Sequence, residues 1–415
     1  MNVAALIPVP LAGWALALGL SAAEAAPQGP VAAGDSTYGC IVCHADKRRS
    51  FGLGVHAERG IRCHDCHGGV PAARERATAH GGRFLGAPGK VRAVAVCASC
   101  HADPNRMRQY GLPADQLAEL RTSRHGELLL ARGDTTAPTC TDCHDAHTVL
   151  PPTDARSPVY PANIPATCGR CHEDARRMQR YGIPTDQGAA YRRSAHGVAV
   201  LEDGDFAAPT CIGCHGSHAA LPPNVTEVSN VCGRCHVLVG RAFAAGPHGS
   251  AGRREGFPGC LACHSNHGTE RVAPGQLTSV CARCHLPDSP PGILAAEVQQ
   301  EITRVGAELE AAQQAIAHLV RSGEVVTDAR FRYQTALTFY HQLGQVQHSL
   351  DRERLADLSL RASAITRDIR AMAEASRERQ WEHRVLLISI WFLALAAVAV
   401  AGFKLTDLKR QRASQ

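Results

Sequence analysis

Long apolar stretches occur at the two ends of the 415-residue chain and are rare between them. Residues 3–22 are apolar, and residues 385–403 form a run of nineteen residues without a charge. A run of that length can cross a bilayer as a helix. Between about residues 35 and 290 the chain is crowded with Gly, Pro, Arg and Asp, and its apolar residues seldom recur with a helical or strand period. This middle region therefore lacks the pattern of a conventional hydrophobic core.

Residues 291–384 have a different pattern, because their apolar residues recur every three or four positions, as on the buried face of an amphipathic or coiled-coil helix. Residues 321–328, RSGEVVTD, interrupt the pattern, with Gly323 as a predicted C-cap and Asp328 as a predicted N-cap. The first apolar seam comprises Val298, Ile302, Val305, Leu309, Ala312, Ile316 and Leu319. The second comprises Leu343, Val346, Leu350, Leu355, Leu358, Ala362, Ile365, Ile369 and Met372. We therefore expect an α-helical hairpin or stalk that can form a homodimer, followed by one C-terminal transmembrane helix at 385–403.

The two ends also predict a location. Residues 1–25 read as a secretory signal peptide that ends in the small-x-small pattern Ala23-Glu24-Ala25, although the absence of Lys and Arg before the apolar run leaves an uncleaved anchor as the alternative. The tail at 404–415 is basic, which predicts that it is cytoplasmic. The expected location is the bacterial inner membrane, with residues 26–290 in the periplasm.

All 18 cysteines belong to nine copies of one motif, C-x-x-C-H. This motif is the attachment site of a c-type haem, in which the two thiols bond to the porphyrin and the histidine is an axial ligand of the iron. A disulfide framework and zinc ribbons also use C-x-x-C pairs, but neither requires a histidine after every pair. The motifs are Cys40-Cys43-His44, Cys63-Cys66-His67, Cys97-Cys100-His101, Cys140-Cys143-His144, Cys168-Cys171-His172, Cys211-Cys214-His215, Cys232-Cys235-His236, Cys260-Cys263-His264 and Cys281-Cys284-His285.

Nine covalently attached haem c groups would replace the missing side-chain core of residues 26–290. We therefore expect a mostly irregular and short-helical module packed around haem. The formal net charge of +6 omits the propionates, which would add about eighteen negative charges. The holoprotein is then acidic, and its arginines are most simply propionate and solvent partners, which argues against nucleic-acid binding.

Internal repeats organise the motifs. Residues 123–152 and 194–223 align without a gap at an offset of 71 residues, and a shortened third copy covers 246–268. Each copy carries a His-Gly, then C-x-x-C-H-x-x-H, then a second motif. The first unit, which contains His56, is degenerate.

The last histidine of C-x-x-C-H-x-x-H, as in His147, cannot reach the opposite face of its own haem but can reach a neighbouring haem. A solvated turn histidine or a propionate partner is the alternative. Outside the motifs the haem region contains nine histidines, which equals the number of second axial ligands required: His56, His64, His80, His125, His147, His196, His218, His248 and His267.

Some members of this set are more certain than others. His80, His125, His196 and His248 each precede a glycine, which we expect to let the backbone approach the porphyrin. His64 lies inside the motif CHDCH, and both ligation of another iron and no ligation remain open for it. Met107 and Met178 are possible substitutes, although packing on the ring is the simpler role. We expect the histidines of the predicted stalk to be ordinary surface or seam residues, with His341 beside Tyr340 as a possible neighbour of a haem: His318, His341, His348 and His383.

These motifs resemble multihaem c-type cytochromes, in particular the class III and doubled C-x-x-C-H families whose haems have two histidine ligands. The resemblance covers residues 40–285. It implies a chain of closely stacked haems that conducts electrons over several nanometres, with redox proteins of the membrane and periplasm as partners.

The expected function is electron transfer between the quinol-linked pool of the inner membrane and periplasmic or outer-membrane acceptors. The alternative is a multihaem reductase or oxidase of a small nitrogen or sulfur compound, which would need one iron with an open sixth position. Every motif supplies a histidine, and no separate group of catalytic acids, bases or nucleophiles stands out, so no catalytic residue is predicted and an electron-transfer protein is favoured over an enzyme.

Overall fold

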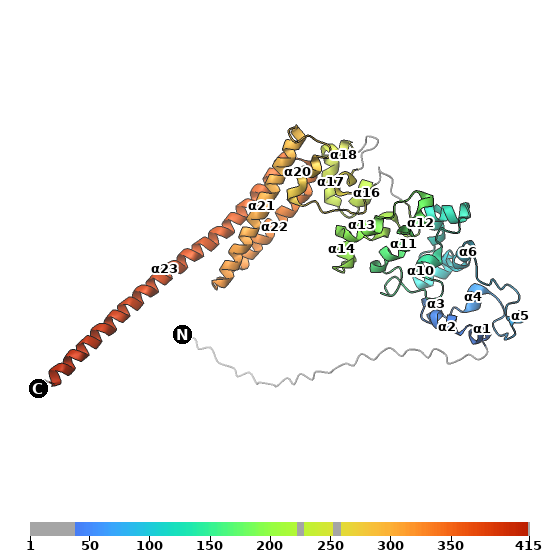
Figure 1. The fold of residues 1–415 in the computed structure, drawn as a ribbon, viewed down its shortest axis with the longest axis horizontal. Helices are drawn as coiled ribbons and strands as arrows, with labels where there is room; N and C mark the ends of the chain where they lie inside the picture. The colour runs from blue at the N-terminus through green and yellow to red at the C-terminus, as the bar shows by residue number, and fades with distance from the viewer. Residues whose placement is uncertain (1–37, 222–227, 252–258, 414–415) are drawn as a thin grey trace, which may run out of the picture.

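The computed structural model describes residues 38–221, 228–251 and 259–413, and within these ranges the chain is mostly helical and has no β-strand. The predicted signal peptide, residues 1–25, lies outside the described residues. Figure 1 shows two parts: a group of short helices, α1 to α20, and three long helices, α21 to α23. We call residues 38–285 the motif module and residues 290–384 the stalk.

The motif module consists of short helices and single turns. The first half contains α1 (Gly39–Cys43), α2 (Ala45–Phe51), α3 (Val55–Glu58), α4 (Cys63–His67), α5 (Arg76–Ala79), α6 (Lys90–His101), α7 (Pro104–Met107), η1 (Arg108–Tyr110), α8 (Gln116–Thr122), α9 (Arg124–Gly126), η2 (Glu127–Ala131) and α10 (Cys140–His144). The second half contains η3 (Pro161–Asn163), α11 (Ile164–His172), α12 (Ala175–Met178), η4 (Gln179–Tyr181), α13 (Gln187–Arg193), α14 (Ala195–Leu201), α15 (Cys211–His215), α16 (Val228–Gly233), α17 (Val237–Ala245), α18 (Pro247–Ala251), α19 (Leu261–His264), η5 (Pro274–Gln276) and α20 (Leu277–Cys281).

The repeat in the sequence is a repeat in structure. Helices α6 to α9 and α11 to α14 follow one another in the same order, each with a short 3₁₀ turn that ends at a left-handed glycine, Gly111 or Gly182. Met107 and Met178 occupy equivalent buried positions, each 5% exposed. Among the described residues of the module, the apolar core cluster is small, with Val94, Leu129 and Ala137 as its buried members. This small cluster agrees with the shortage of apolar core that the sequence predicts for the region.

The stalk has a conventional hydrophobic interior. Helix α21 (Pro290–Arg321) begins at Ser289, whose hydroxyl accepts a hydrogen bond from the Gly292 amide, and it buries the whole first seam predicted from the sequence. Helix α22 (Thr327–Val346) and the first half of α23 (Arg352–Ala413) pack against it. The seam is therefore covered within one chain, and the predicted stalk dimer is not needed to bury it.

The predicted helical hairpin is wrong in one respect, because the second helical stretch is two helices. The turn η6 (Gln347–Ser349) and Leu350, whose φ is 55°, separate α22 from α23 and reverse the chain. The reversal contains no Gly or Pro, so the sequence pattern gave little sign of it. The start of α22 also differs slightly, since Val326 is the N-cap and Asp328 lies in the first turn.

Polar contacts set the register of the three helices. Arg304 on α21 donates hydrogen bonds to Ser359 and Ser363 on α23 at 2.7 and 2.9 Å and forms ion pairs with Glu301 and Glu308. The two serines are almost completely buried, so their small side chains let α23 approach α21 closely. A charged side chain on α21 is thereby satisfied by hydroxyls from α23.

Helix α23 continues beyond the bundle, as Figure 1 shows, and there its apolar side chains are exposed. Trp391, Phe392 and Leu393 are 68%, 70% and 72% exposed. Among the described residues this is the one helix that is long and apolar enough to cross a membrane. It could be a membrane anchor, as the sequence pattern predicts.

We expect Leu343→Ala to weaken the stalk, because Leu343 is fully buried in its core. The free energy of local opening should fall by about 2–5 kcal/mol, the usual result of removing a buried leucine side chain. Hydrogen exchange of α21 and α22 in the full-length protein measures this. Leu360→Ala is the control, since Leu360 is 66% exposed and its loss should change the opening free energy by less than about 0.5 kcal/mol. Equal effects of the two substitutions would contradict the packing described here.

Candidate cofactor sites

Each C-x-x-C-H motif lies on or directly after a short helix. In the motifs that begin at Cys63, Cys140 and Cys211 the whole motif is one five-residue helix, α4, α10 or α15. The residue after the motif histidine then has a positive φ: Gly68 at 71°, Asp145 at 67°, Gly216 at 82° and, in the motif at Cys260, Ser265 at 58°. This conformation ends the helix at the histidine and directs the chain away from it.

Every motif histidine faces a second histidine from elsewhere in the chain, with ring centres 5.9 to 6.2 Å apart. The pairs, motif histidine first, are His44 with His80, His67 with His147, His101 with His56, His144 with His218, His172 with His125, His215 with His267, His236 with His196, His264 with His348, and His285 with His248.

The spacing of these pairs suits two ligands on opposite sides of one metal ion. A bond from an imidazole nitrogen to a transition metal is about 2 Å long, so two such nitrogens lie about 4 Å apart and their ring centres about 6 Å apart. In the described residues no group of three or more His, Cys, Asp or Glu is arranged to hold an ion. A cofactor that brings four metal ligands of its own, such as haem, therefore fits these pairs, and the two neighbouring cysteines supply its covalent attachment.

Hydrogen bonds orient several of the motif rings. The Nδ1 atoms of His67, His215 and His264 lie 2.8, 3.1 and 2.9 Å from the carbonyl oxygens of Gly86, Leu221 and Glu270. A ring whose Nδ1–H donates to a carbonyl keeps Nε2 unprotonated and free to bind a metal. For His215 and His264 the carbonyl belongs to the sixth residue after the histidine, so the repeat preserves this hydrogen bond.

Burial favours the neutral form of the paired histidines that metal binding requires. Burial, with a smaller effect of the facing His172, lowers the pKa of His125 to about 4. Burial likewise lowers the pKa of other members of these pairs, among them His56, His101, His144, His147, His172, His196, His248, His267 and His348. Neutral imidazoles keep the lone pair that binds a metal.

The pairing follows two rules. In one class, the last histidine of C-x-x-C-H-x-x-H faces the equivalent motif of the preceding unit: His147 faces His67, His218 faces His144, and His267 faces His215. These rings are nearly parallel, with interplanar angles of 14°, 21° and 16°. In the other class the rings are more tilted. Four of its five pairs join a histidine that precedes a unit's first motif to the histidine of that unit's second motif, and the fifth joins His80 to His44 of the first motif.

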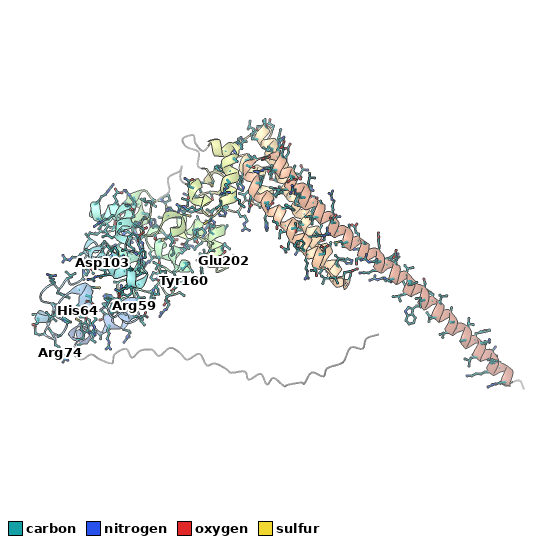
Figure 2. All side chains as sticks on the ribbon, turned by 180° about the vertical axis from the view of Figure 1, so that it is seen from behind. Arg59, His64, Arg74, Asp103, Tyr160 and Glu202 are labelled. Carbon is teal, nitrogen blue, oxygen red and sulfur yellow. The ribbon has the colours of Figure 1, made fainter. Side chains whose placement is uncertain are left out.

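His64 does not belong to either class. Among the ring contacts of the described residues, His64 faces Tyr38 at 5.8 Å, and the Tyr38 hydroxyl lies 3.2 Å from its Nδ1. Its Nε2 lies 3.9 Å from Asp65. His64 sits at the end of the module that is farthest from the stalk, as Figure 2 shows. Its contacts are with Tyr38 and Asp65 and it faces no motif histidine, so the geometry does not place it as a second ligand.

One of the nine histidines that face a motif histidine is His348, which the sequence led us to regard as an ordinary stalk residue. It lies in η6, between α22 and α23, and faces His264 at 6.2 Å. The number of candidate ligands is therefore still nine, with His348 in the place of His64. The lack of a local repeat around His348 explains why the sequence pattern did not identify it.

In two of the four His-Gly pairs the structure shows a further need for the glycine. A Cβ on Gly126 would lie 1.8 Å from the Leu120 carbonyl oxygen, and one on Gly197 would lie 1.9 Å from that of Tyr191. Each glycine amide also donates a hydrogen bond to a buried serine that caps the helix, Ser123 or Ser194. The glycine lets the histidine-bearing helix contact the preceding helix, and this contact positions the histidine.

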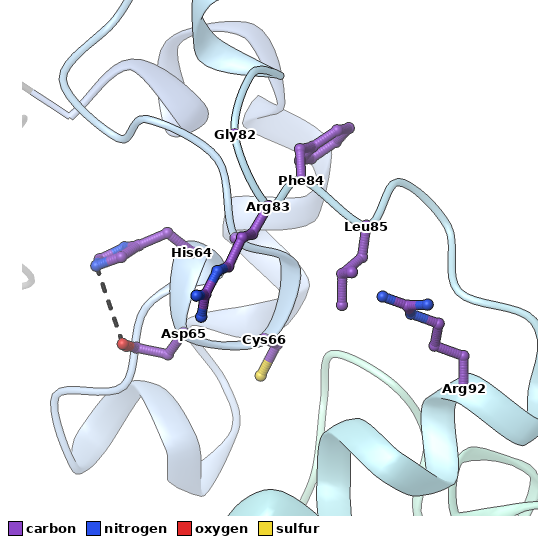
Figure 3. A pocket seen from close by; sticks show the side chains of 9 residues that line it. His64, Asp65, Cys66, Gly82, Arg83, Phe84, Leu85 and Arg92 are labelled. Atoms are coloured by element: carbon purple, nitrogen blue, oxygen red, sulfur yellow. Dashed lines mark ion pairs between the residues drawn. The ribbon is translucent and has the colours of Figure 1, made fainter.

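One motif has an open pocket beside it, shown in Figure 3. The pocket has a volume of about 520 Å³, and Cys66, Arg83 and Arg92 are among the residues that line it. A covalent cofactor attached at Cys66 would therefore meet two guanidinium groups. Such groups suit the carboxylates of haem propionates.

Contacts between cysteines show that the motifs lie in space in the order of the sequence. First cysteines of neighbouring motifs lie close enough to interact in three places, Cys97 with Cys140, Cys168 with Cys211 and Cys232 with Cys260, and the first of these contacts lowers the pKa of Cys140 to about 6. At four other junctions, the second cysteines of neighbouring motifs approach each other. There burial raises the pKa of the cysteine that comes first in the chain, and the thiol of the other cysteine raises it by a smaller amount. These junctions are Cys66 to Cys100, Cys143 to Cys171, Cys214 to Cys235 and Cys263 to Cys284.

The two kinds of contact alternate without a gap from the second motif to the ninth. Tyr38 extends the series to the first motif, since it lies close enough to both Cys63 and Cys40 to interact with them. Helix contacts agree, because α6 packs on α10 and α11 packs on α15. Cofactors attached to successive motifs would therefore be neighbours.

Residues 55–173 match the family model of cytochrome c3. This match supports a multihaem c-type cytochrome and suggests electron transfer. It includes four of the nine motifs, from the one at Cys63 to the one at Cys168. No curated protein and no solved structure matches the chain.

We expect Gly126→Ala to displace His125 from His172, because the added methyl group cannot fit beside the Leu120 carbonyl. The haem content should stay unchanged, while one haem loses its low-spin absorption. Gly89→Ala is the control, since a Cβ at Gly89 meets open space. Visible and electron paramagnetic resonance spectra of both variants measure the effect. Identical low-spin spectra for Gly126→Ala and the unmodified protein would contradict this role of the glycine.

Proposed function

We propose that the protein is a membrane-anchored cytochrome with nine haems that carries electrons between the inner membrane and acceptors in the periplasm or outer membrane. The observation that carries the proposal is the facing of all nine motif histidines by a second histidine at 5.9 to 6.2 Å. A c-type haem with two histidine ligands supplies a one-electron redox centre whose iron has no open position.

The residues of the chain have distinct roles in this proposal. The two cysteines of each motif attach the cofactor, and the motif histidine and the histidine that faces it bind the iron from opposite sides. Backbone carbonyls such as those of Gly86 and Leu221 orient the rings. Arginines such as Arg83 and Arg92 neutralise propionates.

The order of the motifs supports conduction over a long path. Cysteines of successive motifs are neighbours from the second motif to the ninth, so each redox centre inside this series would have one on either side of it. Electrons could then enter at one end of the module and leave at the other. Redox proteins of the membrane and periplasm are the partners that such a path requires.

The apolar end of α23 supports the anchor. Its side chains are exposed over residues 385–403, and Lys404, Lys409 and Arg410 follow it. Positive residues after a membrane span favour a cytoplasmic tail, which would place the motif module in the periplasm, where c-type haem is attached. The enzymatic alternative needs a motif histidine without a facing histidine, and the geometry offers it no such position.

We expect the purified protein to contain nine haems per chain, all six-coordinate and low spin. A pyridine haemochrome assay with the mass of the mature protein gives the count, and fewer than eight haems would refute the proposal. Electron paramagnetic resonance of the oxidised form and carbon monoxide binding to the reduced form test the coordination. A stoichiometric high-spin signal that carbon monoxide titrates would favour a reductase or oxidase instead.

A further inference from the structure

The last histidine of each C-x-x-C-H-x-x-H string faces a motif of the preceding unit, and this rule leaves one motif without such a histidine. Motifs at Cys63, Cys140 and Cys211 each take the last histidine of the following C-x-x-C-H-x-x-H string. The motif at Cys260 is in the last copy, and the sequence contains no further string after it. A second ligand for this position must therefore come from outside the repeats.

His348 occupies that position with the geometry of the same class. Its ring is 6.2 Å from His264 at an interplanar angle of 22°, close to the 14°, 21° and 16° of the three repeat pairs. The tilted class has angles of 32° to 68°. The Nδ1 of His348 lies 3.2 Å from the Gln345 carbonyl, so its Nε2 is the atom left for a metal.

The surroundings of His348 hold it in place. A Cβ on Gly246, at the end of α17, would lie 3.0 Å from the His348 carbonyl oxygen and 2.9 Å from that of Ser349, so the module and the turn η6 are in close contact. Ser349 is buried, and its hydroxyl donates to the Val346 carbonyl at 2.7 Å. The left-handed Leu350 then reverses the chain into α23.

We propose that His348 is the second axial ligand of the haem attached at Cys260 and Cys263, opposite His264. This assignment rests on the proposed function, because it requires haem at that motif. One iron then adds a bond between the motif module and the stalk, which already touch where Leu277 of α20 packs against the stalk core. The stalk is a structural part of the redox module as well as a link to the membrane.

The test replaces His348 with alanine in the full-length protein. We expect nine haems to remain while one of the nine becomes five-coordinate, with a new high-spin signal and one equivalent of carbon monoxide bound after reduction. Added imidazole should restore the low-spin spectrum, a result that a purely structural histidine would not give. His218→Ala is the positive control for loss of a ligand from the same class. His341→Ala, an exposed stalk histidine, is the negative control.

A spectrum of His348→Ala that matches His341→Ala would overturn the assignment. Should His348→Ala disturb folding, His348→Met decides, because methionine keeps a ligand with a weaker field and should give a low-spin haem of raised potential. An unchanged redox titration for that variant would also reject the proposal. Failure of the broader function would appear differently, as too few haems in the unmodified protein.

A second inference rests on the length of α23. From Arg352, next to the turn that carries His348, to Val385, where the apolar run begins, the helix is continuous. With a rise of 1.5 Å per residue, those 33 residues span about 50 Å. The sequence has no cysteine after Cys284, so no covalent haem can lie in this interval. Figure 1 shows the motif module at the opposite end of the stalk from the apolar end of α23.

Electron tunnelling decreases exponentially with distance, so a helix of that length standing along the membrane normal would keep the haems too far from the bilayer for it. We infer that the haems exchange electrons with a partner protein whose redox centre stands clear of the bilayer, and that they do not react directly with a quinol or quinone in the membrane. This inference rests on the proposed membrane anchor, which flotation of the protein with phosphatidylcholine and phosphatidylglycerol vesicles tests separately.

The experiment compares two quinones that share one redox-active ring. Pre-reduced full-length protein in vesicles is mixed anaerobically with ubiquinone-0, which dissolves in water, or with ubiquinone-10, which stays in the bilayer. Because both quinones accept electrons at the same ring, the two reactions have a similar driving force. We expect rapid oxidation by ubiquinone-0 and oxidation at least 100-fold slower by ubiquinone-10. Comparable rates would overturn the inference.

Discussion

The distance between two imidazole rings on opposite sides of one iron is the constraint on which the motif module depends. Nine pairs of histidines are held with ring centres 5.9 to 6.2 Å apart, and their members come from segments distant in the sequence. The described side chains of the module form only a small apolar core cluster. Iron–nitrogen and thioether bonds would therefore supply the long-range contacts that apolar packing supplies in other domains.

Connections between units follow from the same constraint. The last histidine of each C-x-x-C-H-x-x-H string faces a motif in the preceding unit, so every unit is joined to the next through a cofactor position. Positive φ values directly after the motif histidines, such as 67° at Asp145, turn the chain so that this is possible. Two of the four residues concerned are not glycine, so part of the chain adopts a less favourable backbone conformation to satisfy the pairing.

The stalk obeys more familiar rules. Its apolar seam is covered by two neighbouring helices, and Arg304 is satisfied by serines from α23. Such a bundle can form from burial of apolar surface alone. The two parts of the protein thus differ in what stabilises them, and His348 is the point at which a residue of the apolar bundle faces a motif histidine.

The sequence by itself determined the cofactor chemistry, because C-x-x-C-H is a local pattern and its nine copies use every cysteine. It also determined the helical seam of α21 and the apolar run at 385–403, since both depend on periodicity within one segment. Only the tertiary structure decided which histidine faces which motif. That choice depends on chain reversals such as the one at Leu350, which has no glycine or proline to announce it. His348 and His64 exchanged places in the set for this reason: a turn between two helices brings His348 to His264, whereas His64 faces Tyr38 and no motif histidine. The spatial order of the motifs was likewise absent from the sequence, because it depends on which distant segments pack together, as where Cys97 lies beside Cys140, 43 residues away.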